Sequence, residues 1–490
     1  MKGIKMQNEV WESDKLKRRE EAQEFLNYLK AYRINKPTKS LVLNIDAEWG
    51  FGKTYMLENM HKQLQNEGIP CAFYDAWSND FSNEPMISFM LEVKESLKPF
   101  VEEDTENLKS LEKIILGTIK IGAKALTKKY LNIGADELEE LSKISIDQYL
   151  VDEVTDKTNT IIDDCSKKQE NIKATIKTMK NELKSLANSF KNTNNEPLPL
   201  VIFIDELDRC RPNYAIELLE SIKHIFEVEG VFFVMATDTK QLANAFNAVY
   251  GNNYDTKRYL KRFFNMEYKL KKPDGITYAT MLFDEYIGQL SEKLICQTVP
   301  HGSDFNSILI FYFSFFAQSF SLSYRDQKQC LEVLEAILLT YDDRDLYTAK
   351  KLHFLFLIIL IIIRHQNPDA LEKIKSDMDL SSKTTKSFSA LETLHQDYNL
   401  NYDNEKASIV PDTDDEYAPN PSMILTEYSK LFKLDGYSLM KRGYHNTLES
   451  KIINSINNYS GNAYPFHVLS TYPDIIMSAT RYVQDEKDDS

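Results

Sequence analysis

The fold of this chain is decided by one stretch near its N-terminus, which reads Ala47-Glu48-Trp49-Gly50-Phe51-Gly52-Lys53-Thr54. It matches the pattern G-x-x-x-x-G-K-[ST], except that Ala47 stands at the first glycine position. An apolar, β-branched run, Leu41–Asp46 (LVLNID), precedes it, and a helical pattern follows through about Gly68. A strand, such a loop and a helix in succession are the context that identifies a phosphate-binding P-loop.

Phosphate binding explains the residue types of this loop. Backbone N–H groups at a helix N-terminus converge on phosphate oxygens, and glycines let the backbone approach without a Cβ in the way. Lys53 is predicted to neutralise charge on the β- and γ-phosphates, and the Thr54 hydroxyl to ligate Mg²⁺. The rings of Trp49 and Trp77 are expected in the core. The predicted nucleotide-binding residues are Glu48, Trp49, Gly50, Phe51, Gly52, Lys53, Thr54 and Tyr55.

A second motif, Leu200–Glu206 (LVIFIDE), is an apolar strand that ends in two acids. We predict that Asp205 holds Mg²⁺ together with Thr54, and that Glu206 is the general base that orients the attacking water. Acids also end buried strands simply to reach solvent, but the two motifs in this order favour ATP binding and hydrolysis. A further strand, Val231–Ala236 (VFFVMA), leads to Asp238, which we expect beside the γ-phosphate.

The strand signals alternate with helical patterns, which is typical of an α/β layer with a mostly parallel sheet. The expected strands are 41–46, 71–76, 200–204 and 231–236, with helices over 10–33 and 214–228 among others. Asp14 is the expected cap of the first helix. The predicted fold class is therefore α/β, a P-loop NTPase core with a helical insertion and an all-α C-terminal region.

Composition shifts along the chain divide it further. The segments are 1–92, the N-terminal helix and first part of the core; 93–196, a Lys- and Glu-rich helical insertion; 197–272, the second part of the core; 273–365, a helical subdomain; 366–420, a polar linker; and 421–490, a C-terminal helical segment with an acidic tail.

Overall composition excludes several classes of protein. The net charge of −15 argues against a surface that grips nucleic acid or anionic lipid throughout. Five scattered cysteines without a CxxC pair fit a reduced, cytoplasmic protein and no zinc site. The apolar runs 308–317 and 354–363 are about ten residues each, against roughly 20 for a membrane span. We read both as buried helices and expect no membrane partner.

Several blocks together resemble the KAP NTPases of the P-loop class. The family's second-strand block usually has Asn where Asp75 stands, and its Walker B signature a second Asp where Glu206 stands. The blocks are Ser13–Arg18 (SDKLKR), Glu48–Thr54 (EWGFGKT), Phe73–Trp77 (FYDAW), Ile204–Pro212 (IDELDRCRP), Tyr259–Phe264 (YLKRFF) and Ser323–Asp326 (SYRD). The likeness covers roughly residues 10–340.

The resemblance implies an additional-strand P-loop ATPase fold with a trailing helical subdomain. It also implies that Arg262 is an arginine finger, in cis or in trans, and that Arg325 is a second sensor; salt bridges at the surface are the plainer alternative for both. Arg209 would contact a neighbouring subunit or Asp208. Members are often bacterial or phage-related, and several belong to phage-exclusion or anti-phage systems.

The leading functional hypothesis is thus a cytoplasmic ATPase switch that uses ATP and Mg²⁺, acting in anti-phage defence as a homo-oligomer, with a co-encoded effector protein, or both. One alternative is a nucleic-acid-dependent motor or sensor, for which the basic run from Lys257 to Lys272 is the best candidate surface. The other alternative is a nucleotide-dependent scaffold that does not hydrolyse ATP.

Overall fold

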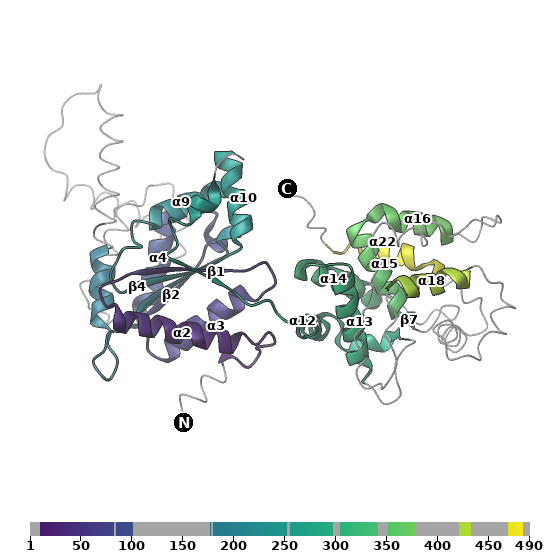
Figure 1. Cartoon of the computed structure of the whole chain (residues 1–490), viewed down its shortest axis with the longest axis horizontal. Coiled ribbons are helices and arrows are strands. Elements are labelled where there is room, and N and C mark those ends of the chain that lie inside the picture. The colour runs from purple at the N-terminus through teal and green to yellow at the C-terminus, as the bar shows by residue number, and fades with distance from the viewer. Residues whose placement is uncertain are drawn as a thin grey trace, which may run out of the picture. The chain divides into compact units, whose positions relative to one another are not determined.

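The computed structural model describes residues 10–82, 85–100, 177, 180–251, 255–296, 304–341, 351–378, 421–432 and 469–483. The chain divides into two compact units, Met1–Lys272 and Pro273–Ser490 (Figure 1). Most of the insertion expected at 93–196 lies outside the described residues, as does the end of the acidic tail.

The first unit is built on a five-stranded parallel sheet in the order β2-β3-β4-β1-β5. The strands are β1 (Leu41–Asp46), β2 (Cys71–Asp75), β3 (Leu200–Asp205), β4 (Val231–Thr237) and β5 (Met266–Lys269). Strand β4 lies between β1, which leads into the P-loop, and β3, which carries Asp205. This is the additional-strand arrangement, and the predicted α/β fold class is confirmed.

Some strands of this sheet can be predicted from the sequence and others cannot. Strands β3 and β4 are buried along their whole length, as is usual when helices cover both faces of a parallel sheet, and they read as continuous apolar runs. Strand β5 lies at the sheet edge and has the sequence MEYK, with three of its four residues exposed. It has neither an apolar run nor an alternation, and sequence reasoning missed it.

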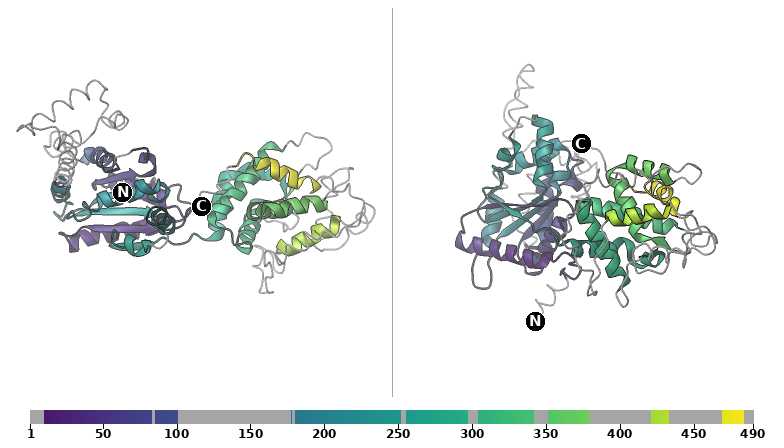
Figure 2. Two further views of the ribbon diagram at one scale, coloured as in Figure 1. Left: turned by 90° about the horizontal axis from the view of Figure 1, so that it is seen from above. Right: turned by 45° about the vertical axis from the view of Figure 1, so that its right-hand side comes forward.

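Helices cover both faces of the sheet (Figures 1 and 2). One face is packed by α2 and α3, and the other by α4, α9 and α10. Their bounds are α2 (Arg18–Asn35), α3 (Lys53–Asn66), α4 (Pro85–Leu97), α9 (Pro212–Ile222), α10 (Thr239–Tyr250) and α11 (Thr256–Leu260), with 3-10 turns at Trp77–Asn79, Lys98–Phe100 and Leu207–Arg209.

The first helix begins later than its apolar spacing predicts. Helix α2 begins at Arg18, not at residue 10. Its N-cap residue is Lys17, and the two carboxylate oxygens of Asp14 accept from the backbone N–H groups of Arg18 (2.8 Å) and Arg19 (2.7 Å). Asp14 therefore satisfies the first two N–H groups of the helix, as a cap would, although it is not the N-cap residue itself. The helix expected over 214–228 is α9, which spans Pro212–Ile222.

In the described part of the second unit, the chain is helical apart from one short parallel pair, β6 (Leu294–Ile295) with β7 (Leu352–His353). Its elements are α12 (Gly275–Leu282), a π-turn Phe283–Ile287, a 3-10 segment Gly288–Lys293, α13 (Phe305–Ser319), α14 (Tyr324–Thr340), α15 (Phe354–Gln366), α16 (Pro368–Met378), α18 (Pro421–Phe432) and α22 (Tyr472–Ala479). Helix α16 occupies residues for which the sequence predicts a linker, and 379–420 lie outside the described residues.

The two apolar runs are buried helices, as predicted. Residues Phe354–Ile363 of α15 are each at most 1% exposed, because α13, α14, α16, α18 and α22 pack around this helix. Among the described residues, no helix has both the length and the apolar character that crossing a bilayer requires. The described cysteines (Cys71, Cys210, Cys296 and Cys330) are all buried, and none of them forms a disulfide with another described cysteine.

Candidate nucleotide site

The candidate site lies at the carboxyl edge of the parallel sheet. Asp46 at the end of β1 is level with Thr237 at the end of β4, and Asp75 at the end of β2 is level with Asp205 at the end of β3. Ligands of open α/β sheets bind outside the carboxyl ends of the strands. The loop of residues 47–52 leaves β1 at this edge and leads directly into α3.

The glycines of this loop are required by its backbone. Gly50 and Gly52 have φ angles of 88° and 79°, a left-handed region that strains residues with a side chain. A Cβ atom at Gly52 would also lie 3.2 Å from Cδ1 of Leu16, in the segment before α2. The loop therefore needs glycine at both positions for its shape.

Lys53 is folded back over the loop. Its Nζ donates to the carbonyl oxygens of Ala47 (2.5 Å) and Glu48 (3.4 Å), and the side chain is buried. Burial raises the pKa values of both Glu206 and Asp208, and the positive charge of Lys53 opposes that rise. The ammonium group is thus the local counter-charge of an acidic edge, in the position where a phosphate would be neutralised.

Asp205 is almost fully buried, and burial raises the pKa of its carboxyl to about 6. Hydrogen bonding from the Thr54 side chain and from the Glu206 N–H (2.8 Å to Oδ1) favours the ionised form and opposes that shift. Its Oδ2 atom is buried and has no hydrogen-bond partner among the described residues. A buried carboxylate oxygen without a partner, beside a hydroxyl, is a donor set that fits Mg²⁺.

Beyond this pair, the part of the chain that the structure describes holds no group of three or more His, Cys, Asp or Glu side chains that could bind a metal. A P-loop magnesium site does not need one, because nucleotide phosphates and water complete the ligand set. Thr54 and Asp205 are the residues that would hold the ion.

Glu206 adopts an unusual backbone conformation, with a φ of 58°. Non-glycine residues in this region are uncommon and concentrate at functional sites. Its carboxylate pairs with Arg209, with 3.0 Å between Oε1 and Nη1. Burial raises the pKa of Glu206, Asp75 and Asp208 add to that rise, and Arg209 and Lys53 oppose it. A carboxylate balanced in this way suits a general base.

Two tryptophans hold Arg209 in place. Its guanidinium lies over the rings of Trp49, in the P-loop, and of Trp77, after β2, at 5.5 and 5.7 Å from the ring centroids. The expectation that Trp77 is a core aromatic is wrong, since it is 53% exposed, and Trp49 is partly buried. Arg209 contacts Glu206 within its own chain, whereas the family resemblance suggested Asp208 or a neighbouring subunit.

Asp208 is an acid that sequence reasoning named only as a possible partner of Arg209. Burial raises its pKa, while Lys53 and a hydrogen bond from the backbone N–H of Asp238 lower it. It therefore joins the Walker B turn to Lys53 and to the end of β4. The available signal was its position, two residues beyond the acids that end β3.

Asp238 caps α10: its Oδ1 accepts from the N–H groups of Lys240 (3.0 Å) and Gln241 (3.3 Å). The polar link between β4 and β1 is made beside it. Thr237 donates to Asn44 Oδ1 (2.9 Å), and Asn44 donates to Thr239 Oγ1 (3.0 Å). Asn44 was not singled out, although a lone amide within an apolar buried strand was a usable signal.

Two predicted site residues lie at the rim. Glu48 is exposed and pairs with Lys240 at 3.2 Å. The hydroxyl of Tyr55 lies 3.5 Å from that of Ser13, and its ring packs edge-on against Trp11. The first turn of α3 is thus tied to the segment that precedes α2.

The structure does not bring Arg262 to the P-loop within the first unit. Asn265, three residues later, bonds to Val42 in both directions near the start of β1, whereas the P-loop leaves from the end of that strand. Arg262 is exposed and lies over the ring of Tyr259 at 5.9 Å. Arg325 belongs to the second unit, in the first turn of α14, which begins with a capping box of Ser323 and Asp326.

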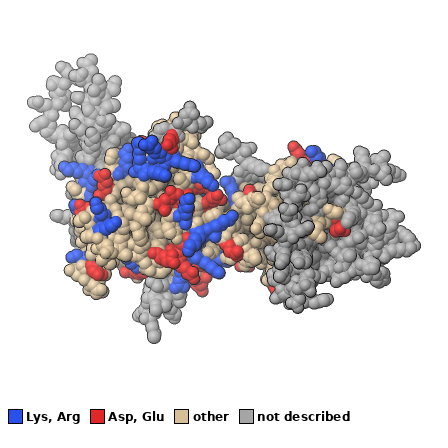
Figure 3. Space-filling view, viewed as in Figure 1, with Lys and Arg blue, Asp and Glu red and all other residues tan. Residues whose placement is uncertain are grey.

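On the face of the first unit drawn in Figure 3, Lys and Arg side chains gather in a band along the upper edge, and Asp and Glu side chains lie below it among further Lys and Arg. Charges of both signs therefore share this face.

Comparison with known proteins shows the family of the chain. A family model described as the KAP family P-loop domain matches residues 18–383. An uncharacterized protein of Methanocaldococcus jannaschii is 28% identical over 196 residues, covering 35% of this chain and 91% of that protein. Among solved structures, the Aeropyrum pernix ORC2 protein, in ADPNP–ADP complexes, aligns over 95% of both chains at 9% identity with a TM-score of 0.31, too low to carry an argument.

Proposed function

The chain belongs to the KAP family of P-loop NTPases, and from this premise we propose that it is an ATPase whose Mg²⁺-dependent hydrolysis drives a molecular switch. One observation carries the proposal: the Thr54 side chain bonds to Asp205 at the carboxyl edge, and Asp205 keeps a buried oxygen without a partner among the described residues. Lys53 supplies positive charge to the neighbouring acids Glu206 and Asp208. Burying a carboxylate in this way is costly unless a cation completes the site.

Phosphate binding would use the loop and the lysine. Backbone N–H groups between Trp49 and Thr54 would donate to phosphate oxygens at the start of α3, where the helix dipole favours negative charge. Lys53 would exchange its bonds to the Ala47 and Glu48 carbonyls for the β- and γ-phosphates. Mg²⁺, held by Thr54 and Asp205, would neutralise charge on the phosphate oxygens when ATP is bound.

Hydrolysis would use Glu206. Its carboxylate would accept a proton from the attacking water as the water oxygen bonds to the γ-phosphorus, and the bond from the γ-phosphorus to the bridging oxygen would break to release ADP. The ion pair with Arg209 and the charge of Lys53 favour the ionised form that a base requires. Asp238, at the end of β4, would stand beside the γ-phosphate as a sensor.

The arginines suggest how the switch is completed. Because Arg262 lies toward the amino ends of the strands, we propose that it acts on a nucleotide held by a neighbouring copy, which requires a homo-oligomer. Arg325 would close the helical unit on nucleotide. As the family resemblance implies, the output would be altered assembly or altered grip on a co-encoded effector in bacterial anti-phage defence.

The test is a substrate trap at Glu206. In Glu206→Gln, ATP binding should stay within about three-fold of wild type, while hydrolysis should fall by roughly 10²- to 10⁴-fold, the usual contribution of a general base. The control is Glu227→Gln, since Glu227 is an exposed glutamate after α9. Binding is measured by calorimetry and turnover by phosphate release, with ATP and GTP in parallel.

The outcomes separate the competing functions. Turnover that survives Glu206→Gln would remove the base role assigned to it. Tight binding by a wild-type chain that never turns over would favour a scaffold, and a wild-type chain that binds neither nucleotide would overturn the proposal.

A nucleic-acid-dependent NTPase is the second candidate, because one basic cluster is exposed. Lys257, Arg258, Lys261 and Arg262 all reach solvent on and after α11, next to the ring of Tyr259. Stimulation of ATP hydrolysis by DNA or RNA that falls steeply with added salt would favour this function.

A further inference from the structure

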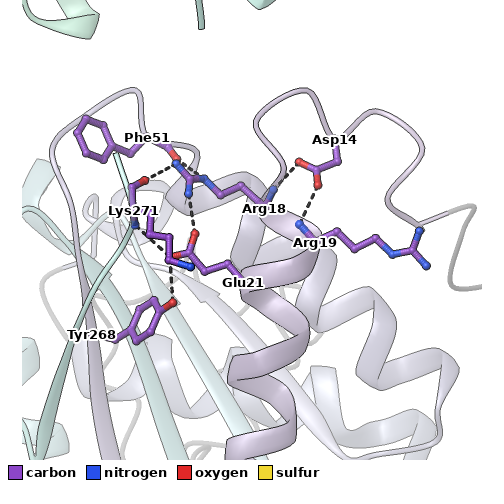
Figure 4. A network of polar contacts seen from close by, with 7 residues as sticks. All are labelled: Asp14, Arg18, Arg19, Glu21, Phe51, Tyr268 and Lys271. Atoms are coloured by element: carbon purple, nitrogen blue, oxygen red, sulfur yellow. Dashed lines mark hydrogen bonds and ion pairs between the residues drawn. The ribbon is translucent and has the colours of Figure 1, made fainter. Parts of the chain in front are cut away.

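A buried arginine at the start of α2 joins three parts of the first unit (Figure 4). The Arg18 guanidinium donates from Nε to the carbonyl of Phe51 (2.9 Å), from Nη2 to the carbonyl of Lys271 (2.8 Å) and from Nη1 to Glu21 Oε2 (2.7 Å). Its side chain is 3% exposed. Phe51 belongs to the P-loop, and Lys271 lies just before the boundary between the units at Lys272.

Glu21 holds the same segment from the other side. Its Oε1 accepts from the Tyr268 hydroxyl (2.9 Å) and from the backbone N–H of Lys271 (3.0 Å), as Figure 4 shows. Both backbone polar groups of Lys271 are therefore held by one buried ion pair. Desolvating two charges opposes folding, and satisfied hydrogen bonds are what make such a pair tolerable.

The bond to Phe51 also orients the loop. A peptide group is planar and trans, so its C=O and N–H point in opposite directions. Because Arg18 holds the Phe51 carbonyl, the Gly52 N–H is directed away from Arg18. Gly52 N–H is one of the groups between Trp49 and Thr54 that phosphate binding would use, so Arg18 fixes the direction of a candidate phosphate donor.

We propose that Arg18 is a positioning residue that sets the P-loop for nucleotide and couples it to the segment at Lys271, through which the chain leaves the first unit. The inference rests on nucleotide binding at the P-loop and adds to it a regulatory contact. Coupling of this kind is reciprocal: if nucleotide orders the Phe51 peptide, the same guanidinium tightens its hold on Lys271.

The test compares two buried arginines of the same helix. Arg33 is also buried and donates to backbone carbonyls, among them those of Ala187 (3.1 Å) and Leu198 (3.3 Å), which lie outside the P-loop. A lysine at either position keeps the charge and loses the planar fork that bridges two carbonyls. Arg33→Lys is thus a matched control for Arg18→Lys.

We expect Arg18→Lys to weaken binding of ADP and of a non-hydrolysable ATP analogue about ten-fold, which corresponds to the loss of one or two hydrogen bonds. Arg33→Lys should lower the melting temperature by about as much as Arg18→Lys does. It should leave both dissociation constants within about two-fold of wild type. Unchanged nucleotide binding in Arg18→Lys, with a wild-type chain that binds, would show that Arg18 is structural only. A wild-type chain that binds no nucleotide would instead overturn the proposed function.

A second measurement needs no variant. Lys271 is exposed, so trypsin can cut after it, and the fragment that begins at Lys272 is identified by its mass. Saturating ADP or ATP analogue should slow this cut several-fold in the wild-type chain, while a cut at Lys177, in the part of the chain leading to β3, serves as an internal reference. Equal cleavage at Lys271 with and without nucleotide would overturn the coupling.

Discussion

The two units of this chain bury different kinds of side chain. Among the described residues, both units bury an apolar core, but every buried Lys, Arg, Asp or Glu side chain lies in the first unit. The buried charged residues of the first unit are Arg18, Glu21, Arg33, Lys53, Lys94, Asp205 and Asp238, and the buried polar residues of the second are Ser291, Gln327 and His353.

This difference suggests that burial serves stability in the second unit and, in part, ligand binding in the first. Burial lowers the pKa of His353 to about 4, so that it is neutral where it meets the Tyr428 hydroxyl at 3.0 Å. In the second unit, every apolar side chain of α15 that is removed from water stabilises the folded state. In the first unit, buried charge opposes folding, and part of it, on Lys53, Asp205 and Asp238, lies at the carboxyl edge where a ligand would use it. The following predictions test that contrast, beginning with the largest effect.

Lys53→Met should reduce ATP hydrolysis by about 10³-fold or more, because the charge that neutralises the transferring phosphate is lost. Its melting temperature should change little, since the methionine fills a similar volume and the lysine bonds only to loop carbonyls. Phosphate release and thermal unfolding measure the two effects. Hydrolysis within ten-fold of wild type, or a collapse of stability, would mean that the first unit's buried charge is structural.

Leu360→Ala should lower stability and leave nucleotide binding unchanged, the opposite of Lys53→Met. Leu360 lies in the middle of α15 with 0% exposure, so its truncation should destabilise the second unit by about 2 to 5 kcal/mol. All three tryptophans (Trp11, Trp49 and Trp77) belong to the first unit, so their fluorescence follows its unfolding, while circular dichroism follows both units.

We expect the circular dichroism transition of the second unit to move to lower denaturant in Leu360→Ala. The tryptophan transition and the dissociation constant for ATP should stay at their wild-type values. If both transitions moved together, the two units would not be independent in stability, and the contrast between them would need to be redrawn.

Sequence reasoning recovered the fold where one signal dominated. The buried strands β1, β3 and β4 are apolar runs, and the P-loop that follows β1 has little alternative interpretation. Edge strand β5 was missed because its exposed residues carry no periodicity. The start of α2 was misplaced because apolar spacing continues through residues 10–17, while the Asp14 carboxylate accepts from the N–H groups of Arg18 and Arg19.

The sequence predicted which residues belong to the candidate site, but it did not predict the contacts between them. The motifs led to Lys53, Thr54, Asp205 and Glu206, but no motif states that Arg209 pairs with Glu206 and lies over two indole rings. Arg18 and Lys271 are 253 positions apart in the chain. Contacts of that kind depend on how the strands are ordered in the sheet, which local pattern does not encode.

Asp205→Asn should make the first unit more stable while removing the proposed magnesium ligand. The folded chain holds the Asp205 proton up to about pH 6, whereas the unfolded chain releases it near 3.8. Between those values the folded state binds more protons, so wild-type stability falls as pH rises, by up to about 3 kcal/mol. The amide carries no such penalty.

The measurement is the tryptophan-detected midpoint in denaturant across this pH range. Asp205→Asn should have the higher midpoint above pH 6, the difference should vanish below pH 4, and added Mg²⁺ should no longer strengthen ATP binding. A lower midpoint for the variant at neutral pH would show that the carboxylate is a structural group, contrary to the contrast between the units.

Arg209→Ala should have the smallest effect, and it tests how finely the first unit's charges are balanced. Removing this guanidinium raises the pKa of Glu206 further, because Lys53 is then the main positive charge that opposes burial and the neighbouring acids. The acid limb of the kcat profile should therefore move to higher pH, while turnover on the alkaline side stays near wild type. Arg209 is about one-third exposed, so the shift should shrink as salt screens the pair.

Arg211→Ala is the matched control, because Arg211 lies two residues away and pairs with Asp80. A profile that superimposes on wild type would mean that Arg209 serves only to pack against the Trp49 and Trp77 rings. The charge of Lys53 would then be what opposes the rise in the pKa of Glu206.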